Sequence, residues 1–182
     1  MEDVRRIAEV IDPRMDMTRT GDVHPSDYAA VLSGRAGRLY AGDMSWGFSR
    51  VGKHMRMING RTDSVLSKPS YSESVLRRRC VIPAGHFYEW DRNKTKISFK
   101  VPAERTMYMA GFYDVRENQE QFVIMTTEAN ASMLPVHDRM PLILSEGQIR
   151  DWIFRDDLLG VMMKQASPML ESWQEYEQLS LF

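Results

Sequence analysis

Short apolar runs separated by polar turns dominate this chain, and they predict a protein built mainly of β-strands. Strand-like runs occupy residues 80–90, 95–101, 106–115 and 121–127. Residues 23–48 contain shorter strand-like runs, which glycines interrupt at Gly34, Gly37, Gly42 and Gly47. Many short strands in succession favour an antiparallel sheet or a small barrel over alternating strand–helix–strand units.

Three segments show the apolar spacing or the boundary residues of helices. The first covers residues 3–12 and should end at Pro13, which cannot continue a helix. The second covers residues 70–79, where the first serine could cap the helix and a glutamate follows three residues later. The third begins at Ser145, and residues 171–182 are predicted as a peripheral strand or tail.

These elements predict one α+β domain over residues 1–182, with antiparallel sheets and helices at their margins. No apolar run approaches the ~20 residues needed to cross a bilayer, and residues 1–6 lack the apolar stretch of a signal peptide. The one cysteine, Cys80, excludes an internal disulfide and suits a reducing compartment. Its strand-like apolar surroundings favour a small buried side chain over a reactive thiol.

Charge is unevenly distributed, although the formal net charge is only −1. Residues 1–27 hold seven acidic and four basic residues, and residues 145–182 hold seven and three. Residues 35–80 hold ten basic and three acidic residues, a net charge of +7. A basic middle between acidic ends favours one cationic face that attracts polyanions, and a solvated basic surface without a partner is the alternative.

Candidate chemistry concentrates in the heptapeptide Pro135–Pro141, which sets His137 and Arg139 two residues apart between two prolines. Proline fixes φ at about −65° and lacks a backbone donor, so a stiff, extended turn between two strands is predicted. His137 can exchange a proton near neutral pH, and Arg139 presents a planar fork suited to phosphate or carboxylate. A histidine that only caps the turn is the alternative.

Three further motifs carry residues with binding or catalytic chemistry. Asn59 follows an apolar run, with Gly60 allowing a close backbone approach and Arg61 beside it. Glu89 lies inside an aromatic run, and apolar surroundings raise the pKa of a carboxyl so that it can serve as acid or base. Trp46 lies beside the basic segment, and such a pairing stacks bases while cations hold phosphates. Taken singly, these residues would also suit a turn, a rim carboxylate and core packing.

Six ordered blocks of residues together resemble the SRAP family, the SOS response-associated peptidase domain. The blocks are Trp46–Phe48, Asn59–Arg61, Arg79–Ala84, Phe87–Trp90, Thr126–Asn130 and Val136–Pro141, and the resemblance extends from about residue 20 to 165. It implies a pseudo-barrel with flanking helices that senses abasic sites in single-stranded DNA. In that family, an N-terminal cysteine attacks the open-chain aldehyde of the abasic sugar and forms a stable thiazolidine crosslink that shields the lesion. The family name records a proposed autoproteolytic unmasking of that cysteine.

The resemblance also implies catalytic roles for three matching residues. Asn59 would hydrogen-bond the sugar-derived group and the N-terminal amine. Glu89 would act as acid or base near that amine, assisting Schiff-base formation and ring closure. His137 would move protons during sugar-ring opening and during β-elimination or crosslink reversal.

Four residues are assigned to DNA binding on the same resemblance. Arg61 and Arg139 would hold the phosphates that flank the lesion, Arg79 would join them, and Trp46 would line the DNA cleft. The expected partner is single-stranded DNA with abasic sites, and no metal, cofactor or membrane is implied. A cytoplasmic monomer that associates with the bacterial nucleoid on DNA damage is expected.

The chain departs from the family at its start. The family begins Met-Cys-Gly-Arg, whereas this chain begins Met1-Glu2-Asp3 and has no cysteine before Cys80. One interpretation is that the strand bearing the nucleophile is missing from the sequence, which the presence of Glu89 and His137 favours. The other is a variant that binds DNA without crosslinking.

Two other functions remain open. A thiol peptidase would use Cys80 and His137, which requires a depressed thiol pKa and a histidine within hydrogen-bond reach. A non-covalent single-stranded DNA-binding module would keep the basic face without any covalent chemistry.

Overall fold

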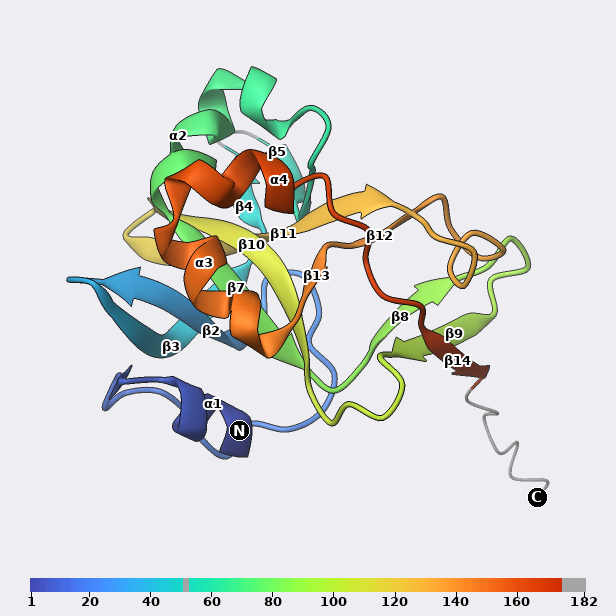
Figure 1. Ribbon diagram of the computed structural model, residues 1–182, viewed down its shortest axis with the longest axis horizontal. Coiled ribbons are helices and arrows are strands. Elements are labelled where there is room, and N and C mark those ends of the chain that lie inside the picture. Colours follow the sequence, from blue (N-terminus) through green and yellow to red (C-terminus); the bar gives the residue numbers. More distant parts are fainter. Residues whose placement is uncertain (51–52, 175–182) are drawn as a thin grey trace.

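Five strands close into a barrel in the computed structural model, which describes residues 1–50 and 53–174 (Figure 1). The barrel strands are β2 (Tyr28–Arg35), β3 (Arg38–Trp46), β7 (Arg79–Ala84), β10 (Met107–Arg116) and β11 (Gln119–Glu128). Their order is β3-β2-β7-β10-β11, and β11 then pairs again with β3 through Gln121 with Ser45 and Phe122 with Trp46. This closure confirms the predicted pseudo-barrel.

Four shorter strands extend the barrel sheet. They are β1 (Val10–Ile11), β6 (Asn59–Arg61), β12 (Arg139–Pro141) and β13 (Ile143–Leu144). Strand β12 pairs antiparallel with β11, and β13 pairs antiparallel with β10. Strands β1 and β6 pair in parallel with β3 and β11, so the predicted antiparallel sheet also contains parallel pairings, which include the contact that closes the barrel.

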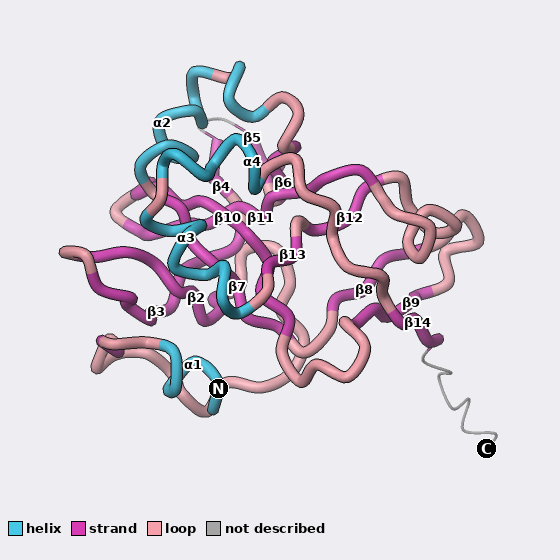
Figure 2. Tube along the Cα trace, in the orientation of Figure 1, coloured by secondary structure: helices cyan, strands magenta, loops and turns pink. Residues whose placement is uncertain are grey.

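Two smaller sheets lie beside the barrel (Figure 2). One is the hairpin of β4 (Phe48–Arg50) and β5 (Lys53–Met57). The other has the order β14-β9-β8 and consists of β14 (Glu171–Gln174), β9 (Lys96–Lys100) and β8 (Phe87–Trp90). The peripheral strand predicted near the end of the chain is therefore confirmed for residues 171–174, and the rest of that prediction lies outside the described residues.

Short helices cover the outside of the barrel (Figure 1). They are α1 (Glu2–Ile7), η1 (Val65–Ser67), α2 (Pro69–Arg77), η2 (Glu146–Gln148), α3 (Ile149–Phe154), η3 (Asp156–Leu158) and α4 (Leu159–Met162). None within residues 1–50 and 53–174 is long and apolar enough to cross a membrane. The helix start predicted at Ser145 is confirmed, and Ser145 and Gln148 form a reciprocal capping box there.

Two predicted helix boundaries are wrong. The first helix ends at Ile7, because Val10 and Ile11 pair in parallel with Tyr40 and Ala41 as β1. That sheet pairing outweighs the helical apolar spacing of the segment. Helix α2 begins at Pro69 without a side-chain cap, so the serine one residue later is already inside the helix.

Alternation along the barrel strands sends side chains into two core clusters. On β7, Cys80 and Ile82 join one cluster and Val81 joins the other. The largest fully buried side chain, Trp152 of α3, lies in the second of these clusters. Its indole N–H donates to the carbonyls of Cys80 at 2.9 Å and Gly111 at 3.2 Å, so α3 is fixed across β7 and β10.

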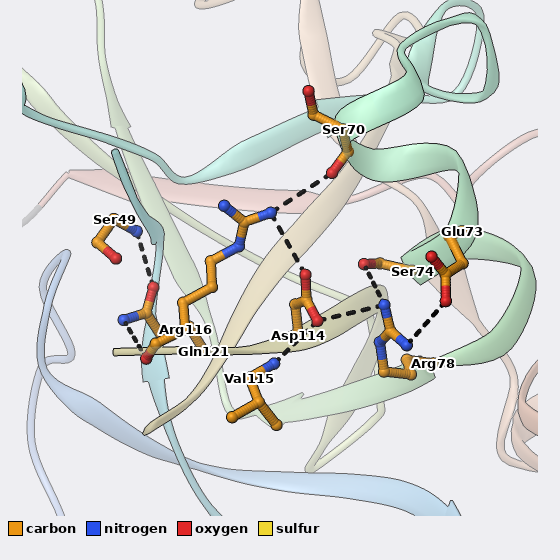
Figure 3. Close-up of polar contacts among 9 residues, drawn as sticks. All are labelled: Ser49, Ser70, Glu73, Ser74, Arg78, Asp114, Val115, Arg116 and Gln121. Atoms are coloured by element: carbon orange, nitrogen blue, oxygen red, sulfur yellow. Dashed lines mark hydrogen bonds and ion pairs between the residues drawn. The ribbon is translucent and has the colours of Figure 1, made fainter. Parts of the chain in front are cut away.

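Asp114 of β10 ties α2 and the start of the β4–β5 hairpin to the barrel (Figure 3). Its carboxylate pairs with Arg78 at 3.2 Å and with Arg116 at 3.3 Å. The Arg116 guanidinium also lies 4.4 Å above the Phe48 ring. Farther along, Gln121 of β11 accepts a hydrogen bond from the backbone N–H of Ser49 at 2.7 Å. Both ends of the excursion that carries β6 are therefore anchored to β10 and β11.

Candidate nucleic-acid site

Strands β6 and β12 lie on either side of β11, which brings together residues far apart in the sequence. In the parallel pair, Asn59 lies opposite Ile124 and Arg61 opposite Thr126. In the antiparallel pair, Arg139 lies opposite Glu128. Asn59 and Arg61 are exposed and, being two residues apart on a strand, project to the same side.

Trp46 holds the backbone that precedes Asn59. Its indole N–H donates to the carbonyl of Ile58 at 3.0 Å, and its ring stacks on Phe122 at a centroid distance of 6.4 Å. The same carbonyl accepts the N–H of Ile124 at 3.1 Å. Trp46 therefore positions β6, whereas its contact with DNA stays a prediction.

Gly60 lets β6 lie directly against the core. A Cβ at this position would be 2.8 Å from the edge of the Phe112 ring, closer than side chains tolerate. The close backbone approach expected at Gly60 is thus an approach to Phe112. With the glycine turned inward, its neighbours Asn59 and Arg61 are turned outward.

Arg139 links the loop after β6 to β11 and β12. Its guanidinium pairs with Asp63 at 3.0 Å and donates to the carbonyl of Thr126 at 2.6 Å, and only 11% of the side chain is exposed. The backbone N–H of Thr62 donates to the same carbonyl at 2.9 Å. Arg61, by contrast, is exposed and has no ion pair within the described part of the chain. Arg61 is therefore the more accessible cation of the two.

Glu89 and His137 lie close enough to influence each other's charge. Burial raises the pKa of the Glu89 carboxyl above its ordinary value, as its aromatic neighbours predict. The positive charge of His137 and the backbone N–H of Trp90 oppose that rise in the pKa of Glu89. The small sheet and the β11–β12 connection thus bring a carboxyl and an imidazole to one place.

Backbone and side-chain contacts hold the ring of His137 at Nδ1. The N–H of Arg139 donates to Nδ1 at 2.9 Å, and the same nitrogen lies 3.1 Å from the carbonyl oxygen of Arg139 and 3.3 Å from the carboxylate of Asp138. The amide favours an accepting Nδ1 and the two oxygens favour a donating one, so these contacts orient the ring in either tautomer. His137 is 43% exposed, so its ring can reach a bound partner.

A carboxyl with a raised pKa near an imidazole held by its neighbours is suited to general acid–base chemistry. Within residues 1–50 and 53–174, no group of three or more potential metal ligands lies together.

Two hollows of the surface lie away from these candidate residues. One of about 380 Å³ is lined by residues between Arg19 and Tyr28, and one of about 390 Å³ is lined by residues that include Tyr108 and Glu146.

Glu89→Gln should stabilise the folded protein at neutral pH. Because the folded-state pKa of Glu89 is raised, its favourable contribution is complete at low pH and is lost as pH rises through that pKa. Glutamine keeps the shape without the charge. Urea denaturation should show a higher free energy of unfolding for Glu89→Gln at about pH 7, and a difference that shrinks toward about pH 4.

The matched control is Glu104→Gln, at an exposed carboxyl. It should leave the pH dependence of unfolding unchanged. If the difference in free energy of unfolding between the parent protein and Glu89→Gln did not vary with pH, the carboxyl at position 89 would not be desolvated.

The structure corrects the prediction that Arg79 binds DNA. Its side chain is 3% exposed and lies under the ends of α2 and α3. It donates to the carbonyls of Trp152 at 2.5 Å and Leu76 at 2.7 Å and pairs with Asp156. A guanidinium enclosed in this way cannot reach a phosphate, so Arg79 holds helix ends to the barrel.

The structure also excludes a thiol peptidase built on Cys80. Its side chain is fully buried in the core, and burial raises the pKa of the thiol well above its ordinary value. A reactive cysteine needs an accessible thiol with a lowered pKa. Cys80 has neither property.

The basic segment forms a narrower cationic face than its net charge predicts, because acidic residues from elsewhere in the chain neutralise part of it. The pairs are Arg35 with Glu120, Arg38 with Glu9, Arg78 with Asp114 and Arg79 with Asp156. Sequence reasoning also missed Asp63, the partner of Arg139. Arg139 lies in a motif singled out from the sequence and Asp63 follows another by two residues, but only the β6–β11–β12 pairing shows that they meet.

Comparisons with known proteins agree with the fold and the motifs. The model of the SOS response associated peptidase (SRAP) family matches residues 2–179. The chain is 31% identical over 159 residues to the abasic site processing protein YoaM of Bacillus subtilis, covering 78% of this chain and 68% of that protein. It is 32% identical over 157 residues to the abasic site processing protein YoqW of the same species, covering 73% and 68%. A crystal structure of a Bordetella bronchiseptica protein has the same fold, with a TM-score of 0.79 over 96% of this chain and 94% of that one at 17% identity.

Proposed function

The chain belongs to the SOS response associated peptidase family, and we propose that it recognises abasic sites in single-stranded DNA at the surface formed by β6, β8 and β12. The observation that carries this proposal is the proximity of Glu89 and His137. Relatives that share about a third of the sequence bear the name abasic site processing protein. A role in the response to DNA damage follows from that recognition.

The proposed chemistry acts on the aldehyde of the abasic sugar. His137 and Glu89 transfer protons as the sugar ring opens and exposes the aldehyde. An amine that adds to this aldehyde forms a carbinolamine, and loss of one water gives an imine. Glu89 in its protonated form supplies the proton to the departing hydroxide, and Asn59 hydrogen-bonds the sugar oxygens.

A stable crosslink needs more than an amine. Closing a thiazolidine ring adds a thiol across the imine, so the same residue must supply both a free amine and a thiol. The sequence contains one cysteine, Cys80, which is internal and buried. We therefore propose that a polypeptide of this sequence recognises the lesion and forms at most a reversible imine with it. A stable crosslink would require a chain that presents an N-terminal cysteine.

Arg61→Ala should weaken binding to single-stranded DNA, because Arg61 is the accessible cation beside Asn59. Losing one phosphate contact should lower affinity and flatten the slope of log affinity against log salt by about 0.7 unit, the value for one phosphate of a single strand. Fluorescence anisotropy with an abasic oligonucleotide at several salt concentrations measures both quantities.

Arg38→Ala is the matched control for this test. Arg38 is an exposed arginine of the same basic segment, but it lies by Glu9 at the β1–β3 edge of the sheet. It should change neither affinity nor slope appreciably. If the affinity of the parent protein for the oligonucleotide did not depend on salt concentration, the proposed DNA surface would be contradicted.

A non-covalent single-stranded DNA-binding module is the second candidate, and the exposed Arg61 would suit it equally well. The two functions differ in their use of Glu89 and His137. Abasic-site recognition predicts tighter binding to an abasic strand than to an intact one, and His137→Ala should reduce that preference. A module without lesion chemistry would bind both strands alike.

A further inference from the structure

The tip of the β8–β9 hairpin is aromatic and basic, and the proposed site does not use it. Trp90 ends β8 and is 53% exposed, one of the largest exposed apolar side chains of the described residues. Arg92 and Lys94 follow in the turn and are exposed. Neither has an ion pair within residues 1–50 and 53–174, so their charges are available to a partner.

The one acidic residue of the turn is directed inward. The Asp91 carboxylate accepts the backbone N–H groups of Asn93 and Thr95, both at 2.8 Å. It therefore closes the turn and does not neutralise its neighbours. Lys94 occupies the left-handed region with φ at 64°, where glycine or asparagine would be less strained. The turn thus carries a cation at a position that its geometry does not favour.

Trp90 directly follows Glu89 on β8, so this tip adjoins the proposed site. Successive residues of β8 face opposite sides, so Glu89 faces His137 while Tyr88 and Trp90 face the other way. Tyr88 and Trp90 pack edge to face at 5.2 Å, and the Lys96 ammonium lies 4.2 Å above the Tyr88 ring. The outer face is therefore a short row of aromatic rings with a lysine against it.

Strand β8 is the edge of its sheet, so nothing within that sheet covers the side of β8 away from β9. In Figure 1 the tip of this hairpin and the turn that carries His137 project on the same side of the barrel. A strand of DNA whose abasic sugar lay between Glu89 and His137 would meet Trp90 with one of its next nucleotides.

We propose that Trp90, Arg92 and Lys94 form a second contact for the same DNA strand. Trp90 stacks on a base beside the lesion, and the two cations hold the phosphates that follow it. This inference rests on the proposed function, because it extends the path of the single strand beyond the abasic sugar. Aromatic rings and cations in combination are the usual means of holding single strands without reading their sequence. An acidic peptide would match the cations but would leave the exposed indole without a base to stack on.

The test compares strands of two lengths by fluorescence anisotropy. A strand of about 5 nucleotides around the abasic sugar covers the proposed site and the base beside the lesion, and one of about 15 nucleotides also reaches the two cations of the tip. Arg92→Ala with Lys94→Ala should weaken binding of the long strand about tenfold and lower its salt slope by about 1.4 units, the value for two phosphates of a single strand. The short strand should bind this variant as it binds the parent protein.

Substitutions at Trp90 test the stacking contact separately. Trp90→Ala should weaken binding of both strands about tenfold, whereas Trp90→Phe keeps a ring and should stay within about twofold of the parent. Arg155→Ala with Lys164→Ala is the matched control, since it removes the same charge from the exposed α3–α4 face. This control should leave both strands unaffected.

The outcomes separate the two proposals. Suppose that the tip variants bind the long strand as well as the α3–α4 control does, while Arg61→Ala still weakens DNA binding. That result would overturn the second contact and leave the proposed function intact. A loss in Trp90→Phe as large as that in Trp90→Ala would overturn the stacking contact, since the ring would then contribute nothing. A parent protein that bound neither strand in a salt-dependent manner would instead refute the proposed function.

Discussion

Incubated with a single-stranded oligonucleotide carrying one abasic site, the 182-residue polypeptide should give no DNA–protein band that survives heat and denaturant. The stable product requires an amine and a thiol on one residue. Glu2 follows Met1, and the thiol of Cys80 is buried with a raised pKa. The measurement is denaturing gel electrophoresis of samples incubated with and without borohydride. A reversible imine should give a band only in the borohydride sample, because reduction makes the bond permanent.

The matched comparison is the same polypeptide with an added Met-Cys-Gly-Arg extension before Met1. Once the initiator methionine is removed, this variant presents the required amine and thiol together, so a stable band should appear. His137→Ala in that background should slow formation or reversal of the crosslink. Cys80→Ser should not change the crosslinking of either polypeptide. A stable crosslink from the unextended chain without reductant would show that Cys80 had been wrongly excluded as the nucleophile.

Arg79→Leu should lower the free energy of unfolding by about 3 kcal/mol, because it leaves buried carbonyls without donors. The guanidinium serves the carbonyls of Val75 and Leu76 on α2 and those of Trp152 and Ile153 on α3. Carbonyls at helix ends have no partner within the helix and favour a nearby cation. Urea denaturation monitored by tryptophan fluorescence gives the change in midpoint and slope.

Arg155→Leu is the control, since Arg155 pairs with Asp157 on the exposed side of the same region. It should cost less than about 1 kcal/mol, as exposed ion pairs do. If Arg79→Leu were as stable as the parent protein and bound DNA more weakly, Arg79 would belong to the DNA surface after all.

The strands and turns of the barrel could be predicted because local pattern and tertiary structure agree there. The apolar runs at 80–90, 106–115 and 121–127 became β7, β8, β10 and β11, since alternating residues fill both core clusters. The first helix was predicted too long for the opposite reason. Val10 and Ile11 satisfy helical spacing and strand pairing equally well, and the exposed edge of β3 decided between them.

The residues of the candidate site could be identified in the sequence, but their arrangement could not. Asn59, Glu89 and His137 stand in separate motifs, and nothing local fixes the distances between them. The position of Asn59 follows from the parallel pairing of β6 with β11, and that of His137 from the turn before β12. Arg79 is a residue whose role was predicted wrongly, because it lies in the basic segment of the sequence yet its side chain is buried.

The sequence by itself determined the β-rich class, the chemistry of the candidate residues and the family, because these depend on residue type, order and local spacing. Only the tertiary structure decided which charges remain available. Arg35, Arg38, Arg78 and Arg79 look like parts of one cationic face in the sequence, and folding brings an acidic partner to each. Ion pairs form between residues that are close in space, whatever their separation in the chain. Arg61 therefore remains an accessible cation of that segment because β6 turns it away from any acid in the described structure.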